Sequence, residues 1–167
     1  ALAHENWQAA LVGPQEKLLR ETSSLMAKTA PEPLIIPCDI GDEAAVHRMA
    51  GQVLNAFGGI EVLVNSAGTN VPNRSLVSLA PENFKRLMDA NINGAYYCVQ
   101  AFLPAMRQQK SGTIINIVSY AAKQASEKAG VAYVISKWGM AGLNQSINAE
   151  ERSNGIRACA IFPGDIN

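Results

Sequence analysis

The segment Thr113-Ile114-Ile115-Asn116-Ile117-Val118-Ser119 is a run of β-branched apolar residues, interrupted by one asparagine, that ends on a serine. A short apolar run of this kind, bounded by turn residues, predicts a strand that is buried on both faces, as the strands of a parallel sheet are. Four more segments share this character. Together they give five predicted strands, at residues 8–13, 34–38, 61–65, 113–118 and 156–162.

Longer segments with a helical repeat of apolar residues separate these strands. Asp42 is a suitable N-cap for a helix that Gly58 can end. Two more helices are predicted, one over residues 81–110 and one from Val131 to about residues 154–155. The alternation of strands and helices predicts an α/β fold with a doubly wound, Rossmann-like parallel sheet in three layers, α/β/α.

Composition predicts one domain over residues 1–167, since the chain is 48% hydrophobic and 17% charged. Fourteen basic and fourteen acidic residues cancel, and no basic stripe is present. The longest uncharged run, residues 90–106, contains Asn, Gln and Pro and suits a bilayer poorly. We therefore expect neither nucleic acid nor a membrane as a partner.

The cysteines and histidines point away from disulfide and metal chemistry. Cys38, Cys98 and Cys159 form no Cys-x-x-Cys pair and suit reduced thiols in the cytoplasm. His4 and His47 are the only histidines, which gives little support to a metal site or a Ser-His-Asp hydrolase. No metal is expected.

Polar and glycine residues gather directly after the predicted strands. In an open parallel sheet, ligands bind beyond the carboxyl ends of the strands. The residues at these ends are Cys38-Asp39, Asn65-Ser66-Ala67-Gly68, Ser119 and Pro163-Gly164. This edge of the sheet is the predicted ligand site.

Tyr133 and Lys137 lie four residues apart in a predicted helix, so their side chains share one face. A tyrosine, with an ordinary pKa of about 10, is a weak base, but an adjacent ammonium favours the phenolate. The pair could transfer a proton, and the Ser119 hydroxyl could bond the same substrate oxygen. The alternative interpretations are that the Tyr-x-x-x-Lys spacing arises by chance and that Ser119 only caps a turn.

Asn91 lies inside a predicted helix, where asparagine has a poor propensity. It is either a tolerated polar residue or the site of a kink whose freed carbonyl holds a water for a proton relay. Asn93 and Gly94, which follow it, are compatible with the kink.

Taken in order, these residues resemble the motifs of the short-chain dehydrogenase/reductase family. The segment 65–68 is similar to the family's Asn-Asn-Ala-Gly with one substitution, 133–137 to its Tyr-x-x-x-Lys, and 163–164 to its Pro-Gly. Asn91 and Ser119 match its helix asparagine and its catalytic serine. The resemblance covers essentially the whole chain.

The resemblance implies hydride transfer between NADP(H) or NAD(H) and a small-molecule carbonyl or secondary alcohol. Tyr133 would be the acid/base, Lys137 would favour the phenolate and bind the nicotinamide ribose, Ser119 would polarise the substrate oxygen, and Asn91 would order a relay water. The resemblance places Asp39 where the family's aspartate contacts adenine. The full set of implied cofactor contacts is Gly13, Asp39, Ile40, Asn65, Ala67, Gly68, Tyr133, Lys137, Pro163 and Gly164. Among these we expect Asn65 to act mainly as a brace between strands.

Two features bear on the cofactor. The family's Thr-Gly-x-x-x-Gly-x-Gly loop would precede Ala1 and its substrate cover would follow Asn167, so we expect a domain that is incomplete at both ends. Gly13, at the end of the strand that normally carries an acidic residue in NAD enzymes, favours NADP(H) over NAD(H). Pro14 stands where arginine is common, with Lys17 as a less certain substitute.

Several alternatives stay open at this point. Tyr120 is a second candidate hydroxyl beside Ser119. A non-catalytic dinucleotide-binding or regulatory protein of the same fold is the main rival, and a sugar-nucleotide epimerase or dehydratase is matched less well by the segment 65–68. The family also implies a homodimer or homotetramer, paired through the long helices at 81–110 and 133–154.

Overall fold

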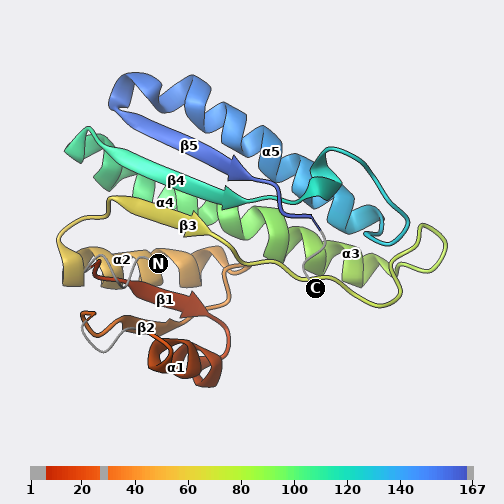
Figure 1. Ribbon diagram of the computed structural model, residues 1–167, viewed down its shortest axis with the longest axis horizontal. Coiled ribbons are helices and arrows are strands. Elements are labelled where there is room, and N and C mark those ends of the chain that lie inside the picture. Colours follow the sequence, from red (N-terminus) through yellow and green to blue (C-terminus); the bar gives the residue numbers. More distant parts are fainter. Residues whose placement is uncertain (1–6, 27–29, 165–167) are drawn as a thin grey trace.

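The computed structural model describes residues 7–26 and 30–164; His4 lies outside these ranges. All five predicted strands are present within two residues of their expected bounds. They are β1 (Ala10–Gly13), β2 (Leu34–Pro37), β3 (Val62–Asn65), β4 (Gly112–Ile117) and β5 (Ile156–Ile161). Every paired strand is parallel to its neighbour (Figure 1).

Two of the predicted helices form as expected. Helix α2 (Glu43–Phe57) begins after Asp42, whose side chain accepts a hydrogen bond from the Ala45 N–H at 3.1 Å. It ends at Gly58, whose φ of +75° is the left-handed conformation that glycine adopts without strain. Helix α5 (Val131–Glu151) continues into a short 3-10 turn (Arg152–Asn154).

The structure corrects the expectation of one helix over residues 81–110. It contains α3 (Pro81–Met88), a π turn (Asp89–Asn93) and α4 (Gly94–Gln109). The Gly94 N–H donates to the carbonyl of Asp89 five residues earlier, which is the hydrogen bond of a π turn. The break in the helix that Asn91 indicated is therefore present as a π turn.

Helix α1 (Glu16–Ser24) was not predicted. It has no buried residue, so the apolar repeat that reveals the other helices is missing. Its stability comes partly from surface pairs such as Arg20 with Glu16, 2.6 Å apart.

The strands form two parallel sheets, β1–β2 and β3–β4–β5. Across the sheet, the order from β1 to β2 runs in one direction, and the order from β3 through β4 to β5 runs in the opposite direction. Right-handed crossovers therefore place α1 on one face and α2, α4 and α5 on the other, as in a doubly wound fold. The predicted three-layer α/β/α class is confirmed.

A slot of about 520 Å³ lies between β1 and β3 and is lined by both strands. The Gly13 carbonyl accepts a hydrogen bond from the N–H of Cys38, the residue after β2, so the backbone groups of Ala10 and Val12 point away from β2. Glu61 accepts a bond from Thr113 of β4, so those of Val62 and Val64 point away from β4. Two strand edges that run in the same direction thus border the slot.

The main core lies between the sheets and the layer formed by α2 and α4. Helix α2 contributes Val46 and Val53, and α4 contributes Phe102 and Met106, all buried. Burial of these apolar side chains is the main force that holds the helices on the sheet. The same packing fixes the strand ends from which the polar side chains described next project.

Candidate active site

A cavity of about 360 Å³ lies at the carboxyl ends of β3, β4 and β5. This is the edge at which the sequence predicted a ligand site. Six of the predicted site residues line it: Gly68, Ser119, Tyr133, Lys137, Pro163 and Gly164.

Lys137 lies behind the ring of Tyr133, on the face of α5 that the four-residue spacing predicts. Its Nζ is 5.6 Å from the centroid of the Tyr133 ring and donates a hydrogen bond to the Ile117 carbonyl at 2.9 Å. The side chain is only 3% exposed. Burial lowers the pKa of Lys137 to about 8, because the charged form loses its water.

The start of α5 is held by the loop that follows β3. The Asn70 side chain donates to the Ala129 carbonyl at 2.9 Å, and the Val131 N–H donates to the Arg74 carbonyl at 3.3 Å. Gly130 has φ +79°, and a Cβ there would lie 2.6 Å from the Cβ of Arg74. Only glycine fits this position, and the helix that carries Tyr133 therefore begins from a fixed point.

Ser119 follows β4 and is half-buried in the cavity wall. Its Oγ accepts a hydrogen bond from the Ala121 N–H at 3.2 Å, which leaves its own proton for another acceptor. The alternative hydroxyl, that of Tyr120, is in an exposed residue outside the cavity lining and lies 3.5 Å from the Gln124 side chain. The geometry favours Ser119.

Asn91 is fully buried in the π turn. Its side chain bonds both backbone groups of Thr69, accepting from the N–H at 2.7 Å and donating to the carbonyl at 2.9 Å. It also lies 3.3 Å from the Ser136 Oγ, and that hydroxyl donates to the Tyr133 carbonyl at 2.8 Å. Asn91 therefore joins the loop after β3 to the first turn of α5.

Gly68 lies where the other site residues converge. A Cβ on Gly68 would be 3.5 Å from the Lys137 Nζ and 3.7 Å from the Asn91 Oδ1. The absence of a side chain keeps the space beside the ammonium open, as the close passage of a cofactor requires. Lys137 and Tyr133, which line the same cavity, are the residues that could hold the ribose hydroxyls of a nicotinamide cofactor.

Asn65 is a brace, as expected. Its Nδ2 donates to the Asn116 Oδ1 at 2.9 Å, and the Asn116 Nδ2 donates to the Asn144 Oδ1 at 3.0 Å. This chain of amides ties β3 to β4 and β4 to α5. It satisfies buried polar groups that would otherwise destabilise the core.

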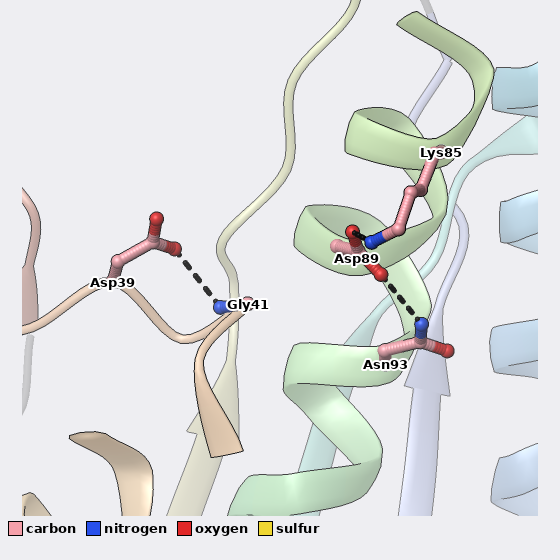
Figure 2. Close-up of polar contacts among 5 residues, drawn as sticks. All are labelled: Asp39, Gly41, Lys85, Asp89 and Asn93. Carbon is pink, nitrogen blue, oxygen red and sulfur yellow. Dashed lines mark hydrogen bonds and ion pairs between the residues drawn. The ribbon is translucent and has the colours of Figure 1, made fainter. Parts of the chain in front are cut away.

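The remaining predicted cofactor contacts lie at the ends of β1, β2 and β3. Ile40, Asn65 and Ala67 line the slot between the two sheets, whereas Gly13 and Asp39 line neither this slot nor the cavity. Gly13 is the last residue of β1, as predicted. Asp39 is exposed, and its Oδ1 accepts from the Gly41 N–H at 2.9 Å (Figure 2).

Three site features escaped the sequence analysis. Thr69 and Ser136 hold Asn91, and the carbonyl of Ile117 holds Lys137. A hydrogen bond to a backbone group does not depend on which side chain the residue carries, so the sequence does not reveal it. A serine inside a helix does not by itself indicate a site residue. Only Ser136, placed between Tyr133 and Lys137, was open to recognition.

Across residues 7–26 and 30–164, no group of three or more His, Cys, Asp or Glu side chains is arranged to hold a metal ion. Within the same ranges, none of the helices combines the length and hydropathy needed to span a membrane.

The sequence matches the family model described as short chain dehydrogenase over residues 1–167. It is 33% identical to 3-oxoacyl-[acyl-carrier-protein] reductase FabG of Staphylococcus aureus over 168 residues, which are 99% of this chain and 67% of that protein. It is 33% identical to an NADPH-dependent pterin aldehyde reductase of Arabidopsis thaliana, covering 92% of this chain and 62% of that protein. The chain thus spans about two thirds of the length of these relatives.

Solved structures agree. A metagenomic short-chain oxidoreductase in complex with NADP matches with a TM-score of 0.91 and 32% identity, over 99% of this chain and 73% of that one. A short-chain dehydrogenase/reductase from Burkholderia xenovorans matches with a TM-score of 0.93 and 25% identity, over 99% of this chain and 65% of that one. The chain belongs to the short-chain dehydrogenase family, whose members are oxidoreductases that act on carbonyl and alcohol groups with NAD(P).

Proposed function

We propose that this chain forms the proton-transfer part of an NADP(H)-dependent reductase that interconverts a small-molecule carbonyl and its alcohol. One observation carries the proposal: the hydroxyl-bearing residues Ser119 and Tyr133 line one cavity, and the buried Lys137 ammonium stands behind the tyrosine ring. A hydroxyl that bonds an oxygen and a second that exchanges a proton with it are the groups that carbonyl reduction needs.

Each of these residues has a separate role in the proposed reaction. Ser119 donates a hydrogen bond to the substrate oxygen, and Tyr133 gives that oxygen a proton during reduction and removes it during oxidation. Lys137 stabilises the phenolate of Tyr133 by its charge. The bound cofactor supplies or accepts the hydride at the carbonyl carbon.

Asn91 acts in this scheme through the backbone of its turn. Its side-chain oxygen and nitrogen are occupied by Thr69, so the side chain is a poor candidate for a water ligand. A π turn leaves a main-chain carbonyl without its usual helical donor. We assign a main-chain carbonyl of this turn as the acceptor for a relay water that returns a proton to the active site.

The preference for NADP(H) over NAD(H) rests on Gly13 at the end of β1. Glycine leaves room for a 2′-phosphate where an acidic side chain would bond the ribose hydroxyl and repel the phosphate. Relatives of both kinds exist, since a 2-dehydro-3-deoxy-L-rhamnonate dehydrogenase (NAD(+)) of Sphingomonas sp. is 32% identical over 129 residues, which are 77% of this chain and 51% of that protein. Gly13→Asp should raise KM for NADPH well above KM for NADH; an unchanged ratio would reject this assignment.

The slot between β1 and β3 supports the expectation that the domain continues beyond residues 1–167. Its two bordering edges offer backbone donors and acceptors to a further parallel strand, and its lining is largely apolar, with Val12, Val62 and Phe102 among the residues. We assign the slot to the strand that carries the family's pyrophosphate-binding glycine loop.

The decisive experiment replaces one hydroxyl. In the complete protein, Tyr133→Phe should lower kcat by about 10³-fold or more while leaving the Kd for NADPH within a few-fold. Lys137→Ala should impair both. Tyr120→Phe is the matched control, because that hydroxyl is exposed and outside the cavity, and it should keep the wild-type rate.

The rival function is a non-catalytic dinucleotide-binding or regulatory protein. It predicts tight NADPH binding without turnover on a panel of aldehydes, ketones and 3-oxoacyl thioesters, and no effect of Tyr133→Phe on any measured property. Retention of most of the rate by Tyr133→Phe in an active enzyme would instead reject our mechanism while keeping the reaction.

We also propose a homodimer or homotetramer in the cytoplasm. Large apolar side chains are exposed on the outer faces of α4 and α5, with Tyr96 at 44% and Trp138 at 54%. The cysteines are free thiols, which suits a reducing compartment. Light scattering should give a dimer or tetramer that Trp138→Glu dissociates; a monomeric wild type would overturn the assembly.

A further inference from the structure

Two glycines reveal how closely the loop after β2 approaches the π turn. A Cβ on Gly94 would lie 2.6 Å from both Cγ1 and Cδ1 of Ile40 and 2.9 Å from the Ile40 carbonyl oxygen. A Cβ on Gly41 would lie 3.4 Å from the Cβ of Asp89. The loop of residues 39–41 therefore packs against Asp89, the first residue of the π turn, and against Gly94, the residue directly after it.

The same turn also packs against the loop after β3 and against α5, the helix that carries Tyr133 and Lys137 of the catalytic cluster (Asn91, Ser119, Tyr133 and Lys137). Asn91, in its middle, is fully buried and holds both backbone groups of Thr69. Ile92 packs against α5, where a Cβ on Gly139 would lie 3.3 Å from the Ile92 Cγ1. Since the turn is packed on two sides, a displacement on one side is transmitted to the other rather than absorbed.

Asp89 braces the turn along its length. Its Oδ2 accepts from the Lys85 Nζ at 2.6 Å, and its Oδ1 accepts from the Asn93 Nδ2 at 2.9 Å (Figure 2). Its carbonyl accepts the Gly94 N–H. One residue thus fixes the last turn of α3, the end of the π turn and the start of α4.

We propose that the π turn Asp89–Asn93 positions both halves of the site at once, seating the Asp39–Ile40 loop for the adenine end of the cofactor and setting Asn91 in the catalytic cluster. Gly94 and Asp89 are its positioning residues, and neither contacts the reacting atoms. The identity of adenine as the ligand rests on the proposed function. The mechanical link between Ile40 and Asn91 does not.

Gly94→Ala tests the link from the cofactor side. The added methyl group overlaps Ile40, so the loop and the turn must separate. In ¹⁵N NMR spectra, the Thr69 backbone amide and the Asn91 side-chain amide should shift. In calorimetric titrations, the Kd for 5′-AMP should rise about tenfold. Adding Ile40→Ala makes space for the methyl group and should return the Thr69 amide towards its wild-type position.

Gly51→Ala is the matched control, because it also adds a methyl group to a helical glycine but meets nothing within 4 Å. It should leave the Thr69 and Asn91 signals and the 5′-AMP affinity unchanged. Wild-type signals for both amides in folded Gly94→Ala would overturn the proposal. Failure of the wild type to bind 5′-AMP would count against the proposed cofactor instead, while the NMR shifts would still decide the link.

Asp89 offers an independent test of the brace. Asp89→Ala removes the acceptors for Lys85 and Asn93 and should move the Thr69 and Asn91 amides, with kcat and KM for the cofactor changing together. Asp89→Asn keeps one side-chain oxygen for Asn93 and should restore most of the wild-type spectrum. Equal spectra for Asp89→Ala and the wild type would show that the carboxylate does not hold the turn.

Discussion

Replacing Lys137 by methionine should stabilise the fold at neutral pH while abolishing turnover. The side chain is only 3% exposed, and burial lowers its pKa from the ordinary lysine value of 10.5 to about 8. A shift of this size means that the charged lysine costs about 3 kcal/mol of folding free energy. Methionine keeps the apolar stem without the charge. It also leaves the Ile117 carbonyl without its Lys137 donor, which costs about 1–3 kcal/mol, so we expect a net gain of about 1 kcal/mol at pH 7.

The pH dependence separates the two contributions. Below pH 8 the lysine is protonated in both states, and the full cost of its burial is present. Between pH 8 and 10.5 the unfolded chain binds the proton and the folded one does not, so wild-type stability rises with pH. Between pH 7 and pH 10 the stability difference should therefore change by about 2–3 kcal/mol in favour of the wild type, so Lys137→Met becomes the less stable protein at pH 10.

Urea unfolding of both proteins at these two pH values is the assay. The difference between the two unfolding free energies cancels the titration of every group that they share. Lys17→Met is the control, since that lysine is exposed and forms only a 3.9 Å surface pair with Glu21. A difference between wild type and Lys137→Met that stays constant from pH 7 to pH 10 would refute the claim that burial of the ammonium destabilises the fold.

Three further predictions concern stability. Arg107→Ala should lower the thermal stability, because it removes the guanidinium partner of the Glu151 carboxylate; that partner also holds the Glu151 pKa below its usual range, so thermal melts should show this contribution present above pH 4.5 and lost as pH falls. Gly130→Ala should cost about 2 kcal/mol or more through its positive φ and its overlap with Arg74, measured by urea unfolding, and an unchanged midpoint would contradict it. Asn116→Ala should cost about 2–4 kcal/mol in the same assay by orphaning its two amide partners, and a loss below 0.5 kcal/mol would show that the amide chain is dispensable.

Most of the fold could be predicted because its strands are short apolar runs and two of its long helices have apolar residues at a helical spacing. The failures have physical causes. Helix α1 buries nothing, so its sequence carries no periodic apolar face. The π turn inserts its extra residue inside a run whose apolar positions read as one helix, and only the unusual Asn91 indicated a break.

The candidate site could be predicted where it depends on the identity of a side chain, but not where it depends on a hydrogen bond to a backbone atom. The positions of Tyr133, Lys137 and Ser119 follow from spacing and strand ends, and the structure brings them to one cavity. The bonds of Asn91 to the Thr69 backbone could not be foreseen, because any residue at position 69 offers the same N–H and carbonyl. The role of each site residue in catalysis stays a prediction.

The slot between β1 and β3 also determines the order in which parts of the protein unfold. Because β1 and β3 share no hydrogen bonds, the β1–α1–β2 unit contacts the rest of the described chain through α2, which packs on α4, and through the Asp39–Ile40 loop, which packs on the π turn. Backbone amides of β1 and β2 should exchange with deuterium through a partial opening that leaves β3, β4 and β5 protected. A strand seated in the slot would merge these two cooperative units into one, so order at the adenine end and order at the catalytic end would then be gained or lost together.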